Sequence, residues 1–124
     1  GLSLTGLAAA HAALVRPGAF SGVLCQSASF WWSDSRLIDD VQNGDHRQQQ
    51  FRITCGLQET EEYFEHGPDL IQRSSQRAAN RAMRDALLEK GHSVSYEEFE
   101  GGHDITSWKS DLPSSLMALL KMTS

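Results

Sequence analysis

The order of apolar and polar positions divides the chain into alternating helices and strands. Residues 3–15 are rich in Leu and Ala and apolar on nearly every side, which predicts a buried helix that ends before Pro17 and Gly18. Residues 22–27 are a short apolar run bounded by turn residues, a pattern typical of a buried strand. Residues 51–55 alternate apolar and polar positions and are followed by Gly56, which also predicts a strand.

The second half of the chain continues the alternation. Residues 37–41 predict a short helix, and residues 74–90 predict a long one that ends at Gly91. We expect the long helix to bury the side that carries Ala78, Ala82, Leu87 and Leu88. Residues 94–99 predict a third strand and residues 114–121 a last helix. Regular alternation of this kind predicts an α/β fold, with helices packed on a mostly parallel sheet.

Charge and cysteine content restrict the partners and the compartment. The net charge is −5, which disfavours nucleic acid and anionic membrane surfaces, because both bind basic faces. No apolar stretch is long enough to cross a bilayer, and the first residues carry no basic segment typical of a signal peptide. Cys25 and Cys55 lie inside apolar runs, so we expect free thiols and a cytoplasmic protein rather than a disulfide. The sequence does not begin with Met, which suggests a processed or truncated chain.

Ser3 is the first candidate for chemistry. Gly1 precedes it by two positions and a predicted helix follows directly, as in the Gly-x-Ser-x-Gly turn that carries the nucleophile of α/β-hydrolases. Position 5 is Thr, however, and the second glycine comes one residue later, at Gly6. On its own, this segment favours a helix cap over a nucleophile, because Ser is a preferred N-cap residue.

His103 is the candidate base. A serine nucleophile needs a histidine within hydrogen-bond reach and an acid that orients the imidazole. His103 lies in a Gly-Gly-His-Asp loop directly after the third predicted strand, where two glycines free the backbone to present the ring at the sheet edge. The alternative is a structural histidine that caps the last helix. The other four histidines lie in a predicted helix, in polar loops or at a helix end, and none has this setting.

Glu59 is the candidate acid, because the acid of an α/β-hydrolase follows a strand and precedes the histidine in the chain. It comes four residues after the strand at 51–55, and Glu61 and Glu62 compete with it. Asp104 adjoins the histidine, but consecutive side chains rarely orient so that one binds the other's imidazole. We expect no metal and no cofactor, because no His or Cys spacing matches a metal-ligand signature.

Five short stretches of the sequence, taken in chain order, resemble the motifs of a known family. They are Gly-Leu-Ser-Leu-Thr-Gly-Leu at 1–7, Val-Leu-Cys-Gln-Ser-Ala-Ser-Phe-Trp-Trp at 23–32, Gly-Leu-Gln-Glu at 56–59, Asn-Arg-Ala-Met-Arg-Asp-Ala-Leu at 80–87 and Glu-Phe-Glu-Gly-Gly-His-Asp at 98–104. Together they resemble the enterochelin (ferric enterobactin) esterase group of the α/β-hydrolase superfamily over nearly the whole chain. Thr5 and Ala28 depart from that group's pattern, which has glycine at both positions.

The resemblance implies a fold and a reaction. Residues 1–124 would form the C-terminal half of an α/β-hydrolase (esterase) domain whose earlier strands are absent. Ser3 would attack a carboxylic ester, of the siderophore (enterobactin) type in this group, and form an acyl-enzyme. His103 would shuttle the proton and Glu59 would orient its ring, while the backbone N–H of Leu4 would donate to the oxyanion.

The resemblance also draws attention to Trp31 and Trp32, whose flat rings could contact an aromatic acyl group. Hydrophobic packing over the sheet edge accounts for the two residues equally well. A small-molecule ester is the expected partner in either case.

Two other functional hypotheses stay open. Thr5 favours a non-catalytic α/β-hydrolase relative that serves as a binding or scaffold module. A general carboxylesterase or thioesterase would keep the same site and differ only in substrate. If the earlier strands are absent, we expect the chain to be poorly stable and nearly inactive alone, unless the missing N-terminal half or another chain completes the sheet.

Overall fold

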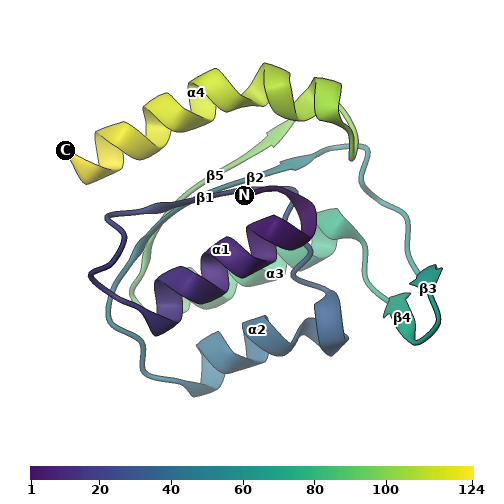
Figure 1. The fold of residues 1–124 in the computed structure, drawn as a ribbon, viewed down its shortest axis with the longest axis horizontal. Helices are drawn as coiled ribbons and strands as arrows, with labels where there is room; N and C mark the ends of the chain where they lie inside the picture. The colour runs from purple at the N-terminus through teal and green to yellow at the C-terminus, as the bar shows by residue number, and fades with distance from the viewer.

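A computed structural model describes residues 1–124 and contains four helices and five strands (Figure 1). The helices are α1 (Ser3–Val15), α2 (Trp32–Asn43), α3 (Gln76–Glu89) and α4 (Ile105–Thr123). The strands are β1 (Val23–Gln26), β2 (Gln50–Gly56), β3 (Phe64–Gly67), β4 (Leu70–Gln72) and β5 (Ser93–Phe99). The strands of the main sheet are parallel and alternate with helices, so the predicted α/β class is confirmed.

The main sheet has the order β1-β2-β5, with β2 in the centre. Helix α4 covers one face, α1 and α3 cover the other, and α2 packs against α3 (Figure 1). At the free edge of β1, Leu2 forms a parallel bridge with Gln26, and the Gly1 carbonyl accepts from the Gln26 N–H at 2.9 Å. The first two residues therefore lie beside β1 like the end of a neighbouring parallel strand.

The two faces of the sheet differ in chemistry because side chains alternate along β2. Phe51 and Ile53 are fully buried in an apolar core that includes Met83 and Leu87 of α3. The intervening residues of β2 point to α4 and are polar. Asp111 of α4 accepts hydrogen bonds from side chains of the sheet and of its own helix, namely Gln26, Thr54 and Ser115. Hydrogen bonds between buried polar side chains therefore contribute to holding helix α4 against the sheet.

The predicted start of the last helix, at residue 114, was wrong. The helix begins at Ile105, because the Asp104 carboxylate caps it by accepting from the Ser107 N–H at 2.8 Å. Pro113 lies inside α4, where it removes one N–H but does not end the helix. Contacts with the sheet on both sides of Pro113 keep the helix continuous.

Two further expectations need correction. In α3, Ala78, Ala82 and Leu88 are exposed, and of the four residues expected inside only Leu87 is buried. The buried side instead carries Ala79, Met83 and Ala86, one residue out of step with the prediction. The antiparallel β3–β4 hairpin lies in a segment for which no strand was expected.

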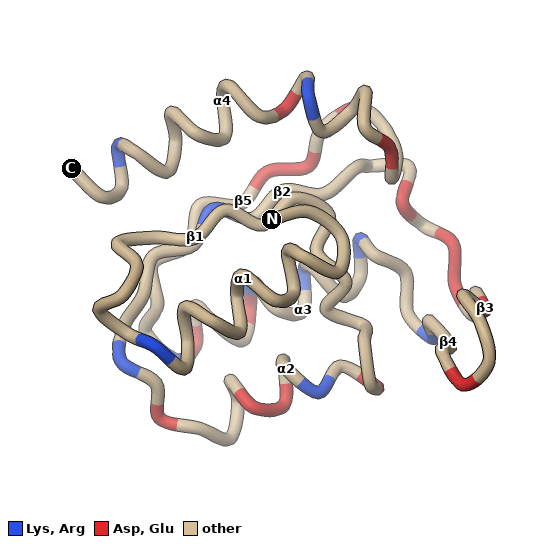
Figure 2. The backbone as a smooth tube through the Cα atoms, viewed as in Figure 1, with Lys and Arg blue, Asp and Glu red and all other residues tan.

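Acidic residues concentrate between β2 and α3. This segment carries Glu59, Glu61, Glu62, Glu65 and Asp69, with no Lys or Arg before Arg73 (Figure 2). None of the four helices combines the length and the apolar character needed to cross a membrane. Both cysteines are buried free thiols.

Candidate active site

Ser3 lies on a sharp turn between the extended Gly1–Leu2 segment and α1. Its φ of 51° is in the left-handed region, which a serine rarely adopts, and this conformation turns the hydroxyl out of the helix. The N-cap of α1 is Leu2, whose own side chain forms no cap hydrogen bond. The Ser3 hydroxyl therefore does not act as the helix cap that the local sequence favoured.

The residues around this turn explain how it is maintained. A Cβ on Gly1 would lie 2.3 Å from the Thr5 carbonyl oxygen, so only glycine fits at this position. The exposed Thr5 side chain accepts from the Leu2 N–H at 3.0 Å and donates to the Leu2 carbonyl at 2.6 Å. Thr5 thus reinforces the turn, although the resemblance would place glycine there.

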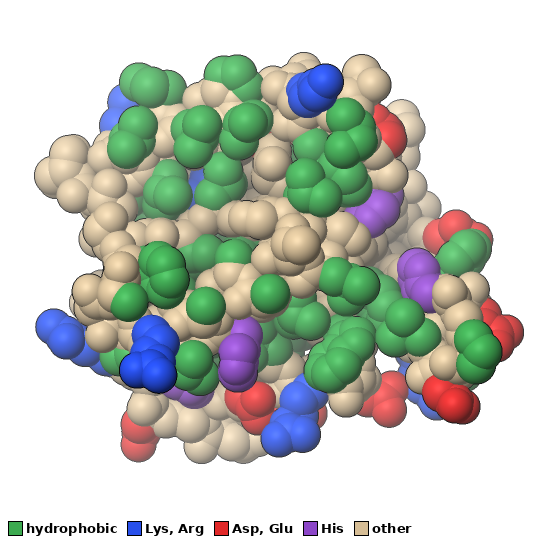
Figure 3. Space-filling model, viewed as in Figure 1, with side chains coloured by type: hydrophobic (Ala, Val, Ile, Leu, Met, Phe, Trp, Pro, Cys, Tyr) green, Lys and Arg blue, Asp and Glu red, His purple; other side chains and the backbone are tan.

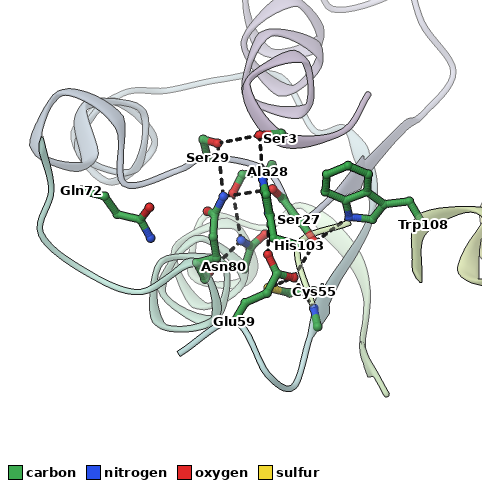
Figure 4. Close-up of polar contacts among 12 residues, drawn as sticks. Ser3, Ser27, Ala28, Ser29, Cys55, Glu59, Gln72, Asn80, His103 and Trp108 are labelled. Carbon is green, nitrogen blue, oxygen red and sulfur yellow. Dashed lines mark hydrogen bonds and ion pairs between the residues drawn. The ribbon is translucent and has the colours of Figure 1, made fainter. Parts of the chain in front are cut away.

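His103 lies between Ser3 and Glu59 in a continuous chain of hydrogen bonds (Figure 4). Its Nε2 is 3.0 Å from Ser3 Oγ, and its Nδ1 is 2.6 Å from Glu59 Oε1. The three residues come from elements far apart in the sequence. The structure therefore brings the three predicted site residues together with the geometry of a nucleophile, a base and an orienting acid.

The loops after β2 and β5 are joined by backbone hydrogen bonds, which sets the Glu59–His103 distance. The Leu57 N–H donates to the Phe99 carbonyl at 2.9 Å, and the Gln58 N–H donates to the Gly101 carbonyl at 3.0 Å. Parallel pairing thus continues beyond both strand ends, and it delivers the acid and the base to the same edge of the sheet.

Glu59 is only 6% exposed and its carboxylate is saturated with donors. Oε2 accepts from the Ser27 hydroxyl and from the Gly56 N–H, both at 2.6 Å, and from the Cys55 thiol at 3.4 Å. Burial alone would raise the pKa of Glu59, but hydrogen bonds from His103, Ser27 and Gly56 outweigh it and hold the pKa below its ordinary value. The acid is therefore ionised near neutral pH.

The competing acids are used elsewhere or face solvent. Glu61 and Glu62 are exposed, and no hydrogen bond joins either of them to the imidazole. Asp104 caps α4, and the backbone N–H of Ser107 lowers its pKa. Burial and the nearby Glu59 charge raise the pKa of the Cys55 thiol, so this residue stays protonated and does not compete as a nucleophile.

Leu4, the predicted oxyanion donor, follows Ser3 in the first turn of α1. The first N–H groups of a helix have no intrahelical acceptor, so the Leu4 N–H is free to donate beside the Ser3 hydroxyl. The helix dipole adds partial positive charge at the same end. Both effects would stabilise negative charge on an oxygen near Ser3.

The two tryptophans lie in different environments. Trp31 is buried, and its ring stacks on His66 with centroids 4.9 Å apart. Trp32 is 42% exposed and borders a mostly apolar groove of about 410 Å³ that also reaches Leu4. Trp31 is therefore a packing residue rather than a residue exposed to substrate. The Trp32 ring, in contrast, is accessible beside Leu4, the candidate oxyanion donor.

A polar cavity next to His103 was not predicted from the sequence. It has a volume of about 320 Å³ and is bordered by Glu61, His66 and Gln72 from the segment around the β3–β4 hairpin. His66 was assigned to a polar loop, and the pattern Phe-Glu-His-Gly-Pro-Asp-Leu-Ile could have revealed the hairpin, because strand-like residues flank a Gly-Pro-Asp turn. No group of three or more His, Cys, Asp or Glu side chains is arranged to hold a metal ion.

A parallel sheet whose strand ends carry Ser, Glu and His, in this chain order, defines the α/β-hydrolase class. The same fold occurs within solved esterases. The family profile described as "Putative esterase" matches residues 1–119. The chain therefore belongs to this esterase family.

Individual relatives agree with the family assignment. The chain is 35% identical over 118 residues to an iron(III) enterobactin esterase of Dickeya dadantii, covering 90% of this chain and 26% of the relative. The crystal structure of the enterobactin esterase from Shigella flexneri, solved in the presence of 2,3-dihydroxy-N-benzoyl-glycine, superposes with a TM-score of 0.79 and 25% identity, covering 98% of this chain and 31% of that one. A ferulic acid esterase shares the fold at 19% identity and a TM-score of 0.72, covering 100% of this chain and 50% of that one. The chain thus spans about a quarter of the length of its curated relatives.

Proposed function

We propose that these residues carry the catalytic triad of a serine esterase. The observation that carries the proposal is the hydrogen-bonded chain from Ser3 Oγ through His103 to the buried Glu59 carboxylate. Ser3 Oγ attacks the ester carbonyl while His103 Nε2 takes the hydroxyl proton. Glu59 holds the other ring nitrogen and stabilises the imidazolium that forms. The oxyanion of the tetrahedral intermediate accepts from the Leu4 N–H.

The reaction is completed by the same groups. The intermediate collapses to an acyl-enzyme on Ser3 as His103 returns the proton to the departing alcohol. Water then enters, His103 accepts one of its protons, and the resulting hydroxide attacks the acyl carbonyl. Expulsion of Ser3 releases the carboxylic acid, and the proton on His103 restores the Ser3 hydroxyl.

We further propose that the substrate is a siderophore-type ester with an aromatic acyl group. The relatives named as iron(III) enterobactin esterases support this class, as do the accessible Trp32 ring and the apolar groove beside Leu4. Rings of this type prefer to stack on flat aromatic surfaces. The polar cavity next to His103 would accommodate the alcohol side of the ester.

We propose that an earlier segment of the same protein, or another chain, completes the domain on the free edge of β1. Only Leu2 forms a bridge with β1 on that side, although a strand edge offers unpaired N–H and C=O groups. Exposed apolar side chains gather over α4 in Figure 3, including Leu112, Leu116, Met117 and Leu120. A second oxyanion donor would come from the added part, and such a donor contributes about 3–4 kcal/mol to transition-state stabilisation. Free cysteines fit a reducing compartment such as the cytoplasm.

Covalent labelling of Ser3 tests the proposal in the full-length protein, meaning the natural polypeptide that contains these residues. A fluorophosphonate probe should label the wild type on Ser3 and should not label Ser3→Ala. Ser110→Ala, an exposed serine on α4, is the matched control and should label like the wild type. A folded wild-type protein that takes no label would reject the esterase and support the non-catalytic binding module that Thr5 suggests.

A hydrolysis panel addresses the substrate. A catecholate trilactone should be cleaved with a higher kcat/KM than simple aryl acetates or acyl thioesters if the siderophore proposal is right. A preference for aryl acetates or thioesters would instead favour a general carboxylesterase or thioesterase with the same triad.

A further inference from the structure

Ser27, a buried residue outside the triad, contacts the acid of the triad, and a second buried residue, Trp108, contacts Ser27. Ser27 is fully buried directly after β1, and Trp108 lies in the first turns of α4, only 7% exposed. The Ser27 hydroxyl is 2.6 Å from Glu59 Oε2 and 2.9 Å from Trp108 Nε1 (Figure 4). This hydroxyl therefore connects an indole of the last helix to the carboxylate of the triad.

The chemistry of the groups sets the direction of these hydrogen bonds. An indole N–H can only donate, so the Ser27 oxygen accepts from Trp108 and its single proton is directed to Glu59. An ionised carboxylate can only accept, so Glu59 Oε1 requires a proton on His103 Nδ1. The neutral imidazole then has its lone pair on Nε2, which lies 3.0 Å from Ser3 Oγ. The indole thus fixes the direction of the Ser27–Glu59 hydrogen bond, and the ionised carboxylate fixes the tautomer of His103.

We propose that Ser27 and Trp108 are positioning residues that hold the Glu59 carboxylate and, through it, the catalytically competent tautomer of His103. The inference rests on the proposed esterase function and extends it to two residues that do not touch the substrate. Trp108 acts at two points, because the edge of its ring also meets the His103 ring, with centroids 4.8 Å apart and planes at 85°.

The backbone of Ser27 is fixed independently of its hydroxyl. Its N–H donates to the Thr54 carbonyl at 2.8 Å, and its carbonyl accepts from Gln76 Nε2 at 3.4 Å. Its φ of 46° is in the left-handed region, so the residue occupies an uncommon conformation between β1 and the segment Phe30–Trp32. Removing the hydroxyl should therefore alter the contact with Glu59 more than the path of the chain.

Ser27 and Trp108 matter most when positive charge develops on His103. As His103 takes the Ser3 proton, the imidazolium forms 2.6 Å from Glu59, where transfer of the Nδ1 proton to the carboxylate would compete. Donors on the opposite oxygen make the carboxylate a weaker base and keep the proton on the imidazole. Ser27 provides one of these donors, and the indole keeps the Ser27 proton pointing toward Glu59.

Variants of the full-length protein test the proposal with p-nitrophenyl acetate as the substrate. Ser27→Ala should lower kcat about tenfold to hundredfold at unchanged KM, the range for loss of a hydrogen bond to a charged group. Because Glu59 loses a donor, the acid side of the pH profile of kcat/KM should move to higher pH. Trp108→Phe keeps a ring against His103 but removes the N–H, and we expect a loss of about threefold to tenfold.

The double variant separates positioning from simple destabilisation. If Trp108 acts through the Ser27 hydroxyl, adding Trp108→Phe to Ser27→Ala should cause little further loss of kcat. Ser115→Ala removes another fully buried hydroxyl, one that contacts Asp111 rather than the triad, and should leave the pH profile unchanged. Multiplicative losses in the double variant, or a shifted profile in Ser115→Ala, would overturn the proposal.

The imidazole ¹⁵N chemical shifts of His103 provide a readout that does not depend on turnover. The wild type should show the Nδ1–H tautomer, and Ser27→Ala should show a mixture of both tautomers. That result without labelling of Ser3 would reject the esterase and keep the positioning role. An unchanged tautomer and unchanged kcat in Ser27→Ala, with an active wild type, would reject the positioning role and keep the esterase.

Discussion

The acid and the nucleophile of the proposed triad are supported in different ways. Glu59 lies at the end of the central strand, is 6% exposed and receives four hydrogen bonds from side chains and backbone of this chain. Ser3 lies at the sheet edge, where residues 1–2 accompany β1, and its hydroxyl contacts His103 and, at 3.5 Å, Ser29. The acid is thus fixed from all sides, whereas the nucleophile faces the part of the molecule where substrate and further strands would lie.

This difference predicts that residues around Glu59 act in catalysis and residues around Ser3 act in substrate binding. Substitutions around Glu59 should impair catalysis and stability together, because the same hydrogen bonds serve both. Substitutions on the Ser3 side, beyond the nucleophile itself, should act on substrate binding, because those side chains are exposed.

The largest effect is expected for Glu59→Gln in the full-length protein. Glutamine keeps the shape of the side chain, but its one oxygen is needed by the Ser27 hydroxyl and the Gly56 N–H, which leaves its NH₂ group facing His103 Nδ1. An NH₂ group cannot accept the Nδ1–H, so the imidazole is driven to the wrong tautomer. We expect kcat to fall about 10³- to 10⁴-fold, as loss of the orienting carboxylate does in serine hydrolases. Steady-state hydrolysis of p-nitrophenyl acetate measures this.

Glu62→Gln is the matched control, since it makes the same change in the same acidic segment on an exposed side chain. Its kcat should stay within about twofold of the wild type, as for most exposed substitutions. Equal losses in the two variants would show that the acid was assigned to the wrong residue.

The second prediction concerns the attachment of α4, the helix that carries Trp108. Asp111→Ala removes the acceptor shared by Gln26, Thr54 and Ser115, and leaves buried donors without partners. The free energy of unfolding should fall by about 2–4 kcal/mol, as expected when a buried hydrogen-bonded network is broken. Urea unfolding of the full-length protein, followed by tryptophan fluorescence, measures it. A change below about 0.5 kcal/mol, typical of surface substitutions, would mean that these bonds do not hold the helix.

Local patterns were sufficient to predict much of this architecture. The bounds of α1 were predicted from its apolar run, and the central strand and β5 were predicted within one residue of their ends. Ser3, Glu59 and His103 were proposed from chain order and strand ends, and they do lie within hydrogen-bond distance. Such features depend on neighbours in the sequence, or on the rule that parallel strand ends meet at one edge.

The remaining features depend on contacts that a single sequence does not encode locally. Ser27 lies 81 positions from Trp108, and neither belongs to a motif that indicates their hydrogen bond. The buried side of α3 was misplaced because several alanines and leucines fit either of two overlapping faces, and only packing against the sheet distinguishes them. The last helix was predicted to start only after Pro113, because the local effect of proline on a helix is clear, whereas the contacts that outweigh it are distant.

The third prediction follows from the pKa of Glu59. The folded protein holds this pKa below its ordinary value of 4.5, so the stabilisation is complete above pH 4.5 and is lost as the pH falls through the folded-state value. The unfolding free energy of the wild type should therefore decline more steeply than that of Glu59→Gln as the pH is lowered below 4.5. Urea unfolding at a series of acidic pH values tests this, and parallel curves for the two proteins would contradict it.

The smallest effect is expected for Trp32, which lies on the exposed side of the site near Ser3. Trp32 contributes no hydrogen bond to the triad, and its ring borders the groove next to Leu4. If it stacks on the acyl group of the substrate, Trp32→Ala should raise KM for aromatic esters about threefold to tenfold, the range for an aromatic pair, while kcat stays unchanged. Phe20→Ala is the control, because Phe20 is a similarly exposed aromatic residue that does not border this groove. A fall in kcat without a change in KM would mean that Trp32 supports the geometry of the nucleophile, and the division between a fixed acid and an open, substrate-binding nucleophile side would not hold.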